Sequence, residues 1–106
     1  MDKTHDLIEN LIQTNSIILF IKGSRALPQC GFSRTVVHIF DLMQIPYVTF
    51  NVLENGDIRQ GIKSYSNWPT IPQVYIDKEF IGGADIITTL YQEGKLQEKI
   101  EKVLAH

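Results

Sequence analysis

The stretch Ile17-Ile18-Leu19-Phe20-Ile21 is apolar at every position and rich in β-branched residues. A strand without polar alternation is typical of the middle of a sheet whose two faces are both covered. Asn15-Ser16 precedes this stretch, and residues 22–29, which include a glycine and a proline, follow it. We therefore expect a central strand over residues 17–21 with a loop at its carboxyl end.

Apolar residues at helical spacing predict a helix on each side of this strand. The first helix spans about residues 3–14. The second has an apolar face formed by Phe32, Val36, Phe40 and Met43. Ile45-Pro46 ends the second helix, and residues 47–52 are predicted to form a second strand. A short third helix opens at residues 55–57, with Asp57 as its N-cap, and runs to about residue 65.

The second half of the chain predicts an antiparallel unit. Residues 72–76 and 79–82 form two short strands joined by Asp77-Lys78, which indicates a hairpin. Asp85 is then expected to cap a helix that Gly94 ends, and a last helix covers about residues 96–104. This order of elements predicts an α/β, thioredoxin-like fold, with a four-stranded mixed sheet flanked by helices in one domain, residues 1–106.

Composition excludes several classes of function. The net charge of −2 gives no electrostatic reason to expect nucleic acid or an anionic membrane as a partner. No apolar run approaches the roughly 20 residues that span a bilayer, and the first residues lack the apolar core of a signal peptide. A single cysteine excludes a disulfide within the chain. We therefore expect a reduced, cytoplasmic protein.

Cys30 is the residue at which chemistry is expected. It lies between the loop and the second helix, and the partial positive charge of a helix N-terminus favours a thiolate. Lys22 adds a full positive charge, Gly31 permits a tight bend, and Ser33 stands where a second thiol would resolve a disulfide. The alternative is a cysteine packed as a small hydrophobic residue, which its place beside Pro28 and Gly31 disfavours.

Three segments together carry a family resemblance. They are Lys22-Gly23 with Cys30-Gly31-Phe32-Ser33, then Trp68-Pro69-Thr70-Ile71-Pro72-Gln73, then Phe80-Ile81-Gly82-Gly83-Ala84-Asp85-Ile86. In order and spacing they resemble the monothiol glutaredoxins, in particular the short, single-domain members found in bacteria and organelles. The resemblance covers nearly the whole chain.

The resemblance implies that two protomers share one [2Fe-2S] cluster through their Cys30 thiolates and two glutathione thiolates. It also implies delivery of the cluster to iron–sulfur recipient proteins and pairing with BolA-like proteins. A [2Fe-2S] cluster normally takes four thiolate ligands. One chain supplies a single one, so Cys30 is the expected metal ligand and the rest come from outside the chain.

The resemblance also implies a glutathione site, whose matching positions are Lys22, Arg59, Ile71, Pro72, Gly83, Ala84 and Asp85. Lys22 and Arg59 would hold the glycyl carboxylate. The Ile71 backbone would pair with the cysteinyl part before a cis Pro72. Gly83 would permit close approach of the chain, and Ala84 and Asp85 would take the γ-glutamyl end.

Each of these positions also has a simpler interpretation. Lys22 and Arg59 could each be a solvated surface charge. Gly82-Gly83 could simply mark the end of a strand, and Trp68 could be a core residue under the Pro72 loop. The histidines, His5, His38 and His106, show no spacing typical of metal ligands.

Two positions depart from the pattern of the family. Ala84 replaces a frequent cysteine, and residues 24–27 differ from the usual proline-containing loop.

Two functions remain open. As a carrier, the protein binds and releases a cluster without covalent turnover, which the resemblance favours. As an enzyme, it is a glutathione-dependent thiol–disulfide oxidoreductase in which the Cys30 thiolate attacks a glutathionylated disulfide and a second glutathione resolves the product. The missing second cysteine removes only the dithiol route, so whether the protein acts as an enzyme stays open.

Overall fold

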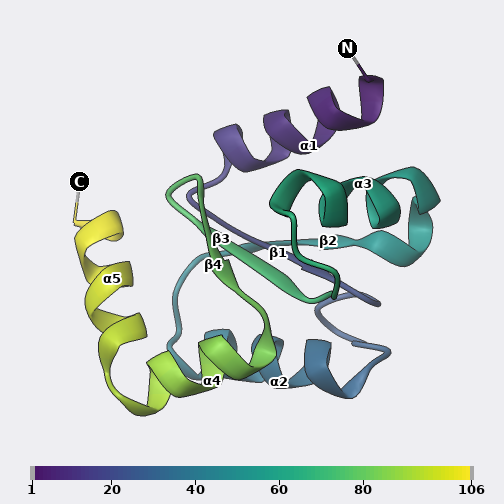
Figure 1. The fold of residues 1–106 in the computed structure, drawn as a ribbon. Coiled ribbons are helices and arrows are strands. Elements are labelled where there is room, and N and C mark those ends of the chain that lie inside the picture. Colours follow the sequence, from purple (N-terminus) through teal and green to yellow (C-terminus); the bar gives the residue numbers. More distant parts are fainter. Residues whose placement is uncertain (1, 106) are drawn as a thin grey trace.

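The computed structural model describes residues 2–105, so Met1 and His106, the ends of the predicted domain, lie outside the described residues. Its centre is a mixed sheet in the order β2-β1-β3-β4 (Figure 1). β1 pairs in parallel with β2 and antiparallel with β3, and β3 pairs antiparallel with β4. The strands are β1 (Ile17–Ile21), β2 (Val48–Asn51), β3 (Gln73–Ile76) and β4 (Glu79–Gly82). The predicted four-stranded mixed sheet is confirmed.

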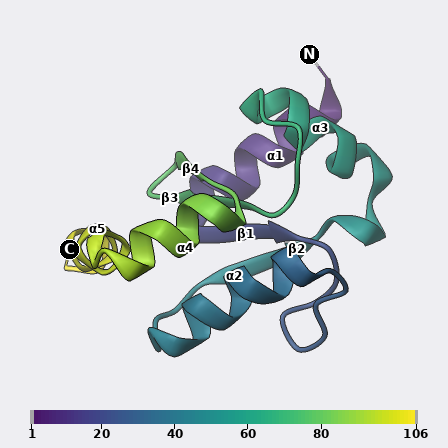
Figure 2. The same ribbon diagram turned by 60° about the horizontal axis from the view of Figure 1, so that its bottom comes forward.

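Helices cover both faces of the sheet, as the apolar sequence of β1 predicts. They are α1 (Lys3–Thr14), α2 (Gly31–Leu42), α3 (Gly56–Ser66), α4 (Ala84–Gln92) and α5 (Lys95–Leu104). Leu19 packs into a core with α2, α4 and α5, whereas Phe20 packs into a second core with α1 and α3. Figures 1 and 2 show α1 and α3 together on one side of the sheet and α2 on the other. Every residue of β1 is consequently buried.

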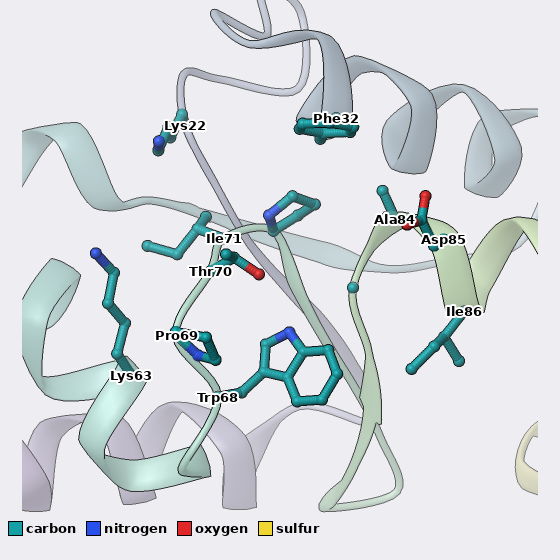
Figure 3. Close-up of a pocket in the computed structure, with 12 residues that line it drawn as sticks. Lys22, Phe32, Lys63, Trp68, Pro69, Thr70, Ile71, Ala84, Asp85 and Ile86 are labelled. Carbon is teal, nitrogen blue, oxygen red and sulfur yellow. The ribbon is translucent and has the colours of Figure 1, made fainter.

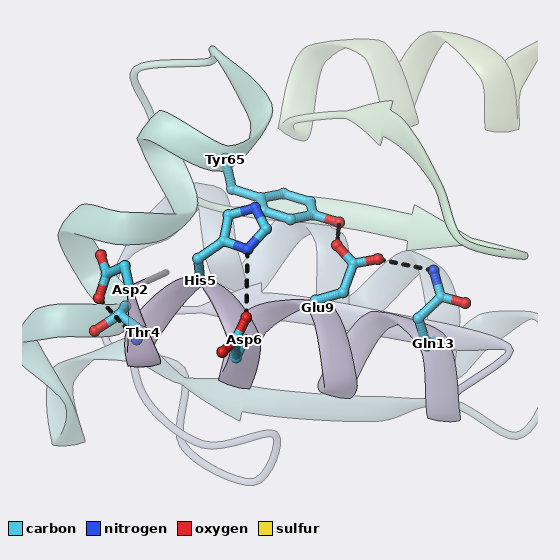
Figure 4. A network of polar contacts seen from close by, with 7 residues as sticks. All are labelled: Asp2, Thr4, His5, Asp6, Glu9, Gln13 and Tyr65. Atoms are coloured by element: carbon cyan, nitrogen blue, oxygen red, sulfur yellow. Dashed lines mark hydrogen bonds and ion pairs between the residues drawn. The ribbon is translucent and has the colours of Figure 1, made fainter.

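The pair of helices α1 and α3 is joined by a polar network as well as by its core (Figure 4). The Tyr65 hydroxyl donates to Glu9 Oε2 at 2.6 Å, and Gln13 Nε2 donates to Glu9 Oε1 at 3.0 Å. The bond from Tyr65 is the main reason that the pKa of Glu9 lies below its ordinary value. Gly61 lets the helices approach, because a Cβ there would lie 2.7 Å from Thr4 Cγ2. These contacts hold α3, which borders the site described below, against the rest of the molecule.

Two predicted helix caps are wrong, and in each case the true N-cap lies two residues before the predicted one. Asn55, not Asp57, is the N-cap of α3, because its side chain accepts a hydrogen bond from the Ile58 N–H at 3.0 Å. α4 begins at Ala84 with Gly83 as its N-cap, so Asp85 lies inside the first turn. Both acidic residues therefore lie where a carboxylate favours the helix dipole without capping it. Sequence patterns commonly misplace a helix end by one or two residues.

Other boundaries follow from hydrogen bonds that the sequence pattern does not show. β2 ends at Asn51 because the Asn51 side chain accepts from the Leu53 N–H at 3.0 Å and starts a short 3₁₀ helix, η1 (Val52–Glu54). The predicted hairpin is confirmed: Asp77 and Lys78 have φ angles of 50° and 70°, and positive values at both central residues are those of a type I′ turn. In the described part of the chain, no helix is long and apolar enough to cross a membrane.

Candidate functional site

Cys30 is the N-cap of α2, and its sulfur faces the first turn of that helix. The Ser33 N–H donates to Cys30 Sγ at 3.4 Å, and the Ser33 hydroxyl lies 3.6 Å from the same sulfur. Ser33 is fully buried, and its Oγ accepts from the Lys22 N–H at 3.0 Å. Ser33 therefore links the end of β1 to the start of α2 directly beside the sulfur.

The environment of Cys30 stabilises the thiolate. Partial burial raises the pKa of the Cys30 thiol, but opposing effects outweigh it. These are the hydrogen bonds from the backbone and side chain of Ser33 and from the backbone of Phe32, together with the positive charge of Lys22. The net result is a pKa below the ordinary value of a cysteine. A thiolate is both the nucleophile and the metal ligand of cysteine chemistry, so this sulfur is suited to either role.

The loop between Lys22 and Cys30 closes on itself and brings the two residues together. Gly23 forms a β-bridge with Pro28, and the Gln29 N–H donates to the Lys22 carbonyl at 2.9 Å. Gly23 has a φ of +97°, and a Cβ there would lie 2.6 Å from the Gln29 nitrogen. Glycine is therefore required at this position.

The tip of the same loop is tied to the far end of α2. Arg25 Nη2 lies 2.7 Å from Asp41 Oδ1, and the guanidinium stacks over the Tyr47 ring at 4.1 Å. The Tyr47 hydroxyl also donates to Asp41 Oδ1, at 2.6 Å. Arg25 thus fixes the loop tip against Asp41 and Tyr47.

A pocket of about 410 Å³ lies beside the first turn of α2 (Figure 3). Its walls come from the end of β1, from α3, from the segment 68–72 and from the start of α4. The lining residues are Lys22, Phe32, Lys63, Trp68, Pro69, Thr70, Ile71, Pro72, Gly83, Ala84, Asp85 and Ile86. The peptide bond between Ile71 and Pro72 is cis, as the family resemblance predicts.

Charge is distributed unevenly around this pocket. Lys22 and Lys63 lie on one side, and Asp85 lies on the other (Figure 3). The N-terminus of α4 opens onto the Asp85 side and has no side-chain cap, so its first N–H groups are free for a ligand. At Gly83 a Cβ would lie 3.2 Å from the Pro72 carbonyl, which leaves the backbone itself as the pocket wall. The arrangement suits an elongated ligand that carries both charges.

The structure gathers most of the predicted binding residues. Lys22, Ile71, Pro72, Gly83, Ala84 and Asp85 all line the pocket. Cys30 is not among the lining residues, but it caps the helix whose first turn carries the lining residue Phe32. Arg59 does not line the pocket either. It lies on α3 one turn before Lys63, and Lys63 is the cation that α3 supplies to the wall.

Sequence reasoning missed the place of three residues in the pocket wall. Lys63 follows Arg59 by four positions, so the helical period was a signal that both share one face. Phe32 was expected on the apolar face of its helix but is 65% exposed, because the first turn of α2 borders the pocket. Trp68 was expected in the core. Its ring does pack on Phe80, at 5.7 Å between centroids, but it also forms pocket wall.

Within residues 2–105, no group of three or more histidine, cysteine, aspartate or glutamate side chains is arranged to hold a metal ion. Cys30 therefore stands as a single, half-buried sulfur donor. Any metal centre that uses it needs donors from elsewhere. For chemistry, the site therefore offers one thiolate, that of Cys30, next to a pocket large enough for a small ligand.

Comparisons with known proteins show the family of this chain. The glutaredoxin family model matches residues 17–81. An uncharacterized monothiol glutaredoxin of Synechocystis is 52% identical over 103 residues, covering 97% of this chain and 96% of its own length. The chloroplastic monothiol glutaredoxin-S14 of Arabidopsis thaliana is 48% identical over 99 residues, 93% of this chain and 57% of the relative.

Solved structures of glutaredoxins are similar to this chain in fold. The solution structure of reduced poplar apo GrxS14 has a TM-score of 0.82 and 46% identity, covering 95% of this chain and 93% of that one. A buckwheat glutaredoxin–glutathione complex has a TM-score of 0.83 at 23% identity, covering 94% and 89%. At that identity the likeness shows the fold, which confirms the predicted thioredoxin-like architecture.

Proposed function

The chain belongs to the glutaredoxin family as a monothiol member, and from this premise we propose that it binds glutathione in the pocket beside Cys30 and carries a [2Fe-2S] cluster shared between two protomers. The observation that carries the proposal is the pairing of a single stabilised thiolate with a pocket that has cations at one side and a carboxylate at the other. A cytoplasmic location belongs to the same proposal, because Cys30 has to stay reduced.

Glutathione has one thiol, two carboxylates and one ammonium group, and the pocket offers a partner for each charge. Lys22 and Lys63 suit the glycyl carboxylate, with Arg59 one helical turn away. At the opposite side, the free N–H groups of α4 suit the γ-glutamyl carboxylate and Asp85 suits its ammonium. The Ile71 backbone lies between these sides, where the cysteinyl part would pair with it.

The number of ligands supports a shared cluster. Four thiolates are needed, one chain has one cysteine, and the described residues hold no other metal-binding group. Two protomers and two glutathiones complete the set, with the cluster as cargo. Losing a glutathione would open the cluster to the cysteines of an iron–sulfur recipient protein. The same proposal includes a heterodimer, in which a BolA-like protein takes the place of the second protomer.

A second function is favoured by the lowered pKa and partial exposure of Cys30. In a glutathione-dependent oxidoreductase, the Cys30 thiolate attacks the glutathione sulfur of a mixed disulfide, and the substrate thiolate leaves. A second glutathione thiolate then attacks the glutathione sulfur bound to Cys30, which releases the Cys30 thiolate and oxidised glutathione. The net reaction consumes one free glutathione and converts the mixed disulfide into the substrate thiolate and oxidised glutathione, so no second protein cysteine is needed.

Anaerobic reconstitution with iron, sulfide and glutathione, followed by sedimentation, tests the carrier proposal. We expect a monomeric apo form and a coloured dimer that contains one cluster and two glutathiones. Reconstitution without glutathione is the control and should leave a colourless monomer. A metal-free dimer of the same mass, or a cluster-loaded monomer, would contradict the shared cluster. An assay of glutathione-dependent disulfide reduction on the apo form measures the second function separately.

A further inference from the structure

We propose that Gln73 is the positioning residue of the pocket: its buried carboxamide holds the segment 68–72 in the shape that presents Ile71 to the ligand. The inference rests on the proposed binding of glutathione. Gln73 does not itself line the pocket. Its Nε2 instead donates to the carbonyls of Trp68 and Thr70, both at 3.2 Å. Among residues 2–105, it shares complete burial with only one other polar side chain, Ser33.

The orientation of this carboxamide follows from its partners. The two carbonyls of the segment 68–72 are acceptors only, so the NH₂ group must face them. On the other side, the Tyr75 hydroxyl donates to Gln73 Oε1 at 3.2 Å. Tyr75 is itself held in the core, packed on Phe20 and Phe80 at 5.7 and 5.5 Å between ring centroids. Gln73 therefore connects a rigid aromatic cluster to the segment that forms the pocket wall.

The segment 68–72 needs such a support because it has little structure of its own. It belongs to no helix or strand, and Pro69 and Pro72 have no N–H group to donate. Figure 3 shows it running from α3 past Trp68 and Thr70 to Ile71 along one wall of the pocket. With Gln73 bound to two of its carbonyls, the position of the Ile71 backbone is set before a ligand arrives. Preorganisation of this kind raises affinity because less conformational freedom is lost on binding.

Two substitutions of similar size separate hydrogen bonding from simple filling of the core. Gln73→Met keeps the length of the side chain and removes every hydrogen bond. Gln73→Glu keeps the shape, but its carboxylate would face two carbonyls and repel them. Burial would raise the pKa of this introduced carboxyl, and the protonated acid can donate one hydrogen bond. The Gln73→Glu variant should therefore recover function as the pH falls, whereas Gln73→Met should not.

Calorimetric titration with reduced glutathione, at about pH 8.5 and about pH 5.5, measures the effect. Relative to the wild type, we expect affinity to fall about tenfold in both variants at the higher pH. At the lower pH, Gln73→Glu should regain most of this loss and Gln73→Met none. The wild type, titrated in parallel, removes the contribution of protons that glutathione itself gains. Wild-type affinity in both variants, or a loss in Gln73→Glu that is the same at both pH values, would overturn the assignment.

Folding and ligand binding are checked separately. Trp68 is the only tryptophan of the chain, and its carbonyl accepts from Gln73, so its fluorescence reports on the segment without any ligand. We expect the emission of Gln73→Glu to differ from the wild type at high pH and to approach it at low pH. If the wild type failed to bind glutathione, the proposed function would fall, while unchanged Trp68 emission in the variants would overturn the role of Gln73.

Should both Gln73 variants unfold, Tyr75→Phe replaces them. This change removes the hydroxyl that orients the carboxamide but keeps the aromatic ring in the core. We expect its glutathione affinity to fall severalfold while its circular dichroism matches the wild type. Full wild-type affinity in the folded Tyr75→Phe protein would contradict the proposal.

Discussion

The corner around Cys30 and the pocket beside it are neighbours in space, but they are built differently. The corner comes from one segment, residues 22–33: the contacts of Ser33 with Cys30 and with Lys22 span three and eleven positions of the chain. The pocket is assembled from the end of β1, from α3, from the segment 68–72 and from α4. A short segment can thus set the chemistry of a sulfur, whereas the pocket depends on segments that lie far apart in the chain.

The largest expected effect comes from a substitution in the corner that leaves the pocket unchanged. Cys30→Ser removes the only protein thiolate, so the cluster should be lost completely. The half-buried sulfur contributes little to packing, and the charged groups of the pocket are untouched, so the fold and the binding of glutathione should persist. Iron and sulfide analysis after reconstitution, with circular dichroism and glutathione calorimetry as controls, measures this. A variant that still holds stoichiometric iron would refute the role of Cys30.

An intermediate effect is expected at the cationic side of the pocket. If glutathione binds as proposed, Lys22→Ala and Lys63→Ala should each remove a charge-assisted hydrogen bond to its glycyl carboxylate. Such a bond is worth about 1–2 kcal/mol at a half-buried position, or roughly five- to thirtyfold in glutathione affinity. Arg59→Ala, one turn away and outside the pocket wall, is the matched control and should weaken binding less than Lys63→Ala. The reverse order in calorimetry would restore Arg59 as the main contact of α3.

The smallest expected effect is a change in the pKa of Cys30 caused by a substitution that leaves the sulfur in place. Ser33→Ala deletes the hydroxyl that contacts Cys30 Sγ, so the pKa of the thiol should rise toward its ordinary value. The pH at which alkylation by iodoacetamide reaches half its maximal rate should then increase. The rate near neutral pH should fall severalfold. Thr35→Ala removes another hydroxyl from the same helix, one that donates to the Gly31 carbonyl, and serves as the control. An unchanged pH profile in Ser33→Ala would assign the lowered pKa to the backbone and Lys22.

Most of the fold was predictable because each strand and helix has a clear pattern of apolar residues. The run at 17–21 has no polar position, and the structure buries all of it between two helical layers. The errors lie at the ends of elements. Asn55 and Asp57 are both good caps by residue type, and only the hydrogen bond to the Ile58 N–H decides between them. Side-chain bonds of this kind depend on backbone angles that a sequence pattern does not specify.

The site was predictable in part. Cys30 stood out from its position at a helix start, and six residues that line the pocket followed from the family resemblance. Lys63 was missed, although it follows Arg59 at helical spacing, because many lysines on helices simply face solvent. Gln73 lies within a motif, but its role could not be predicted, since nothing in a sequence shows that a carboxamide is buried beneath a loop.

By itself, the sequence determined the order of the elements, the central place of β1 and the identity of the single thiol, because these depend on local patterns of residues. Only the tertiary structure decided which cation faces the pocket, that Phe32 and Trp68 form part of its wall, and that Gln73 supports it from beneath. The physical reason is that these roles arise from contacts between segments far apart in the chain. Burial, charge and hydrogen bonding at such contacts are properties of the packed molecule.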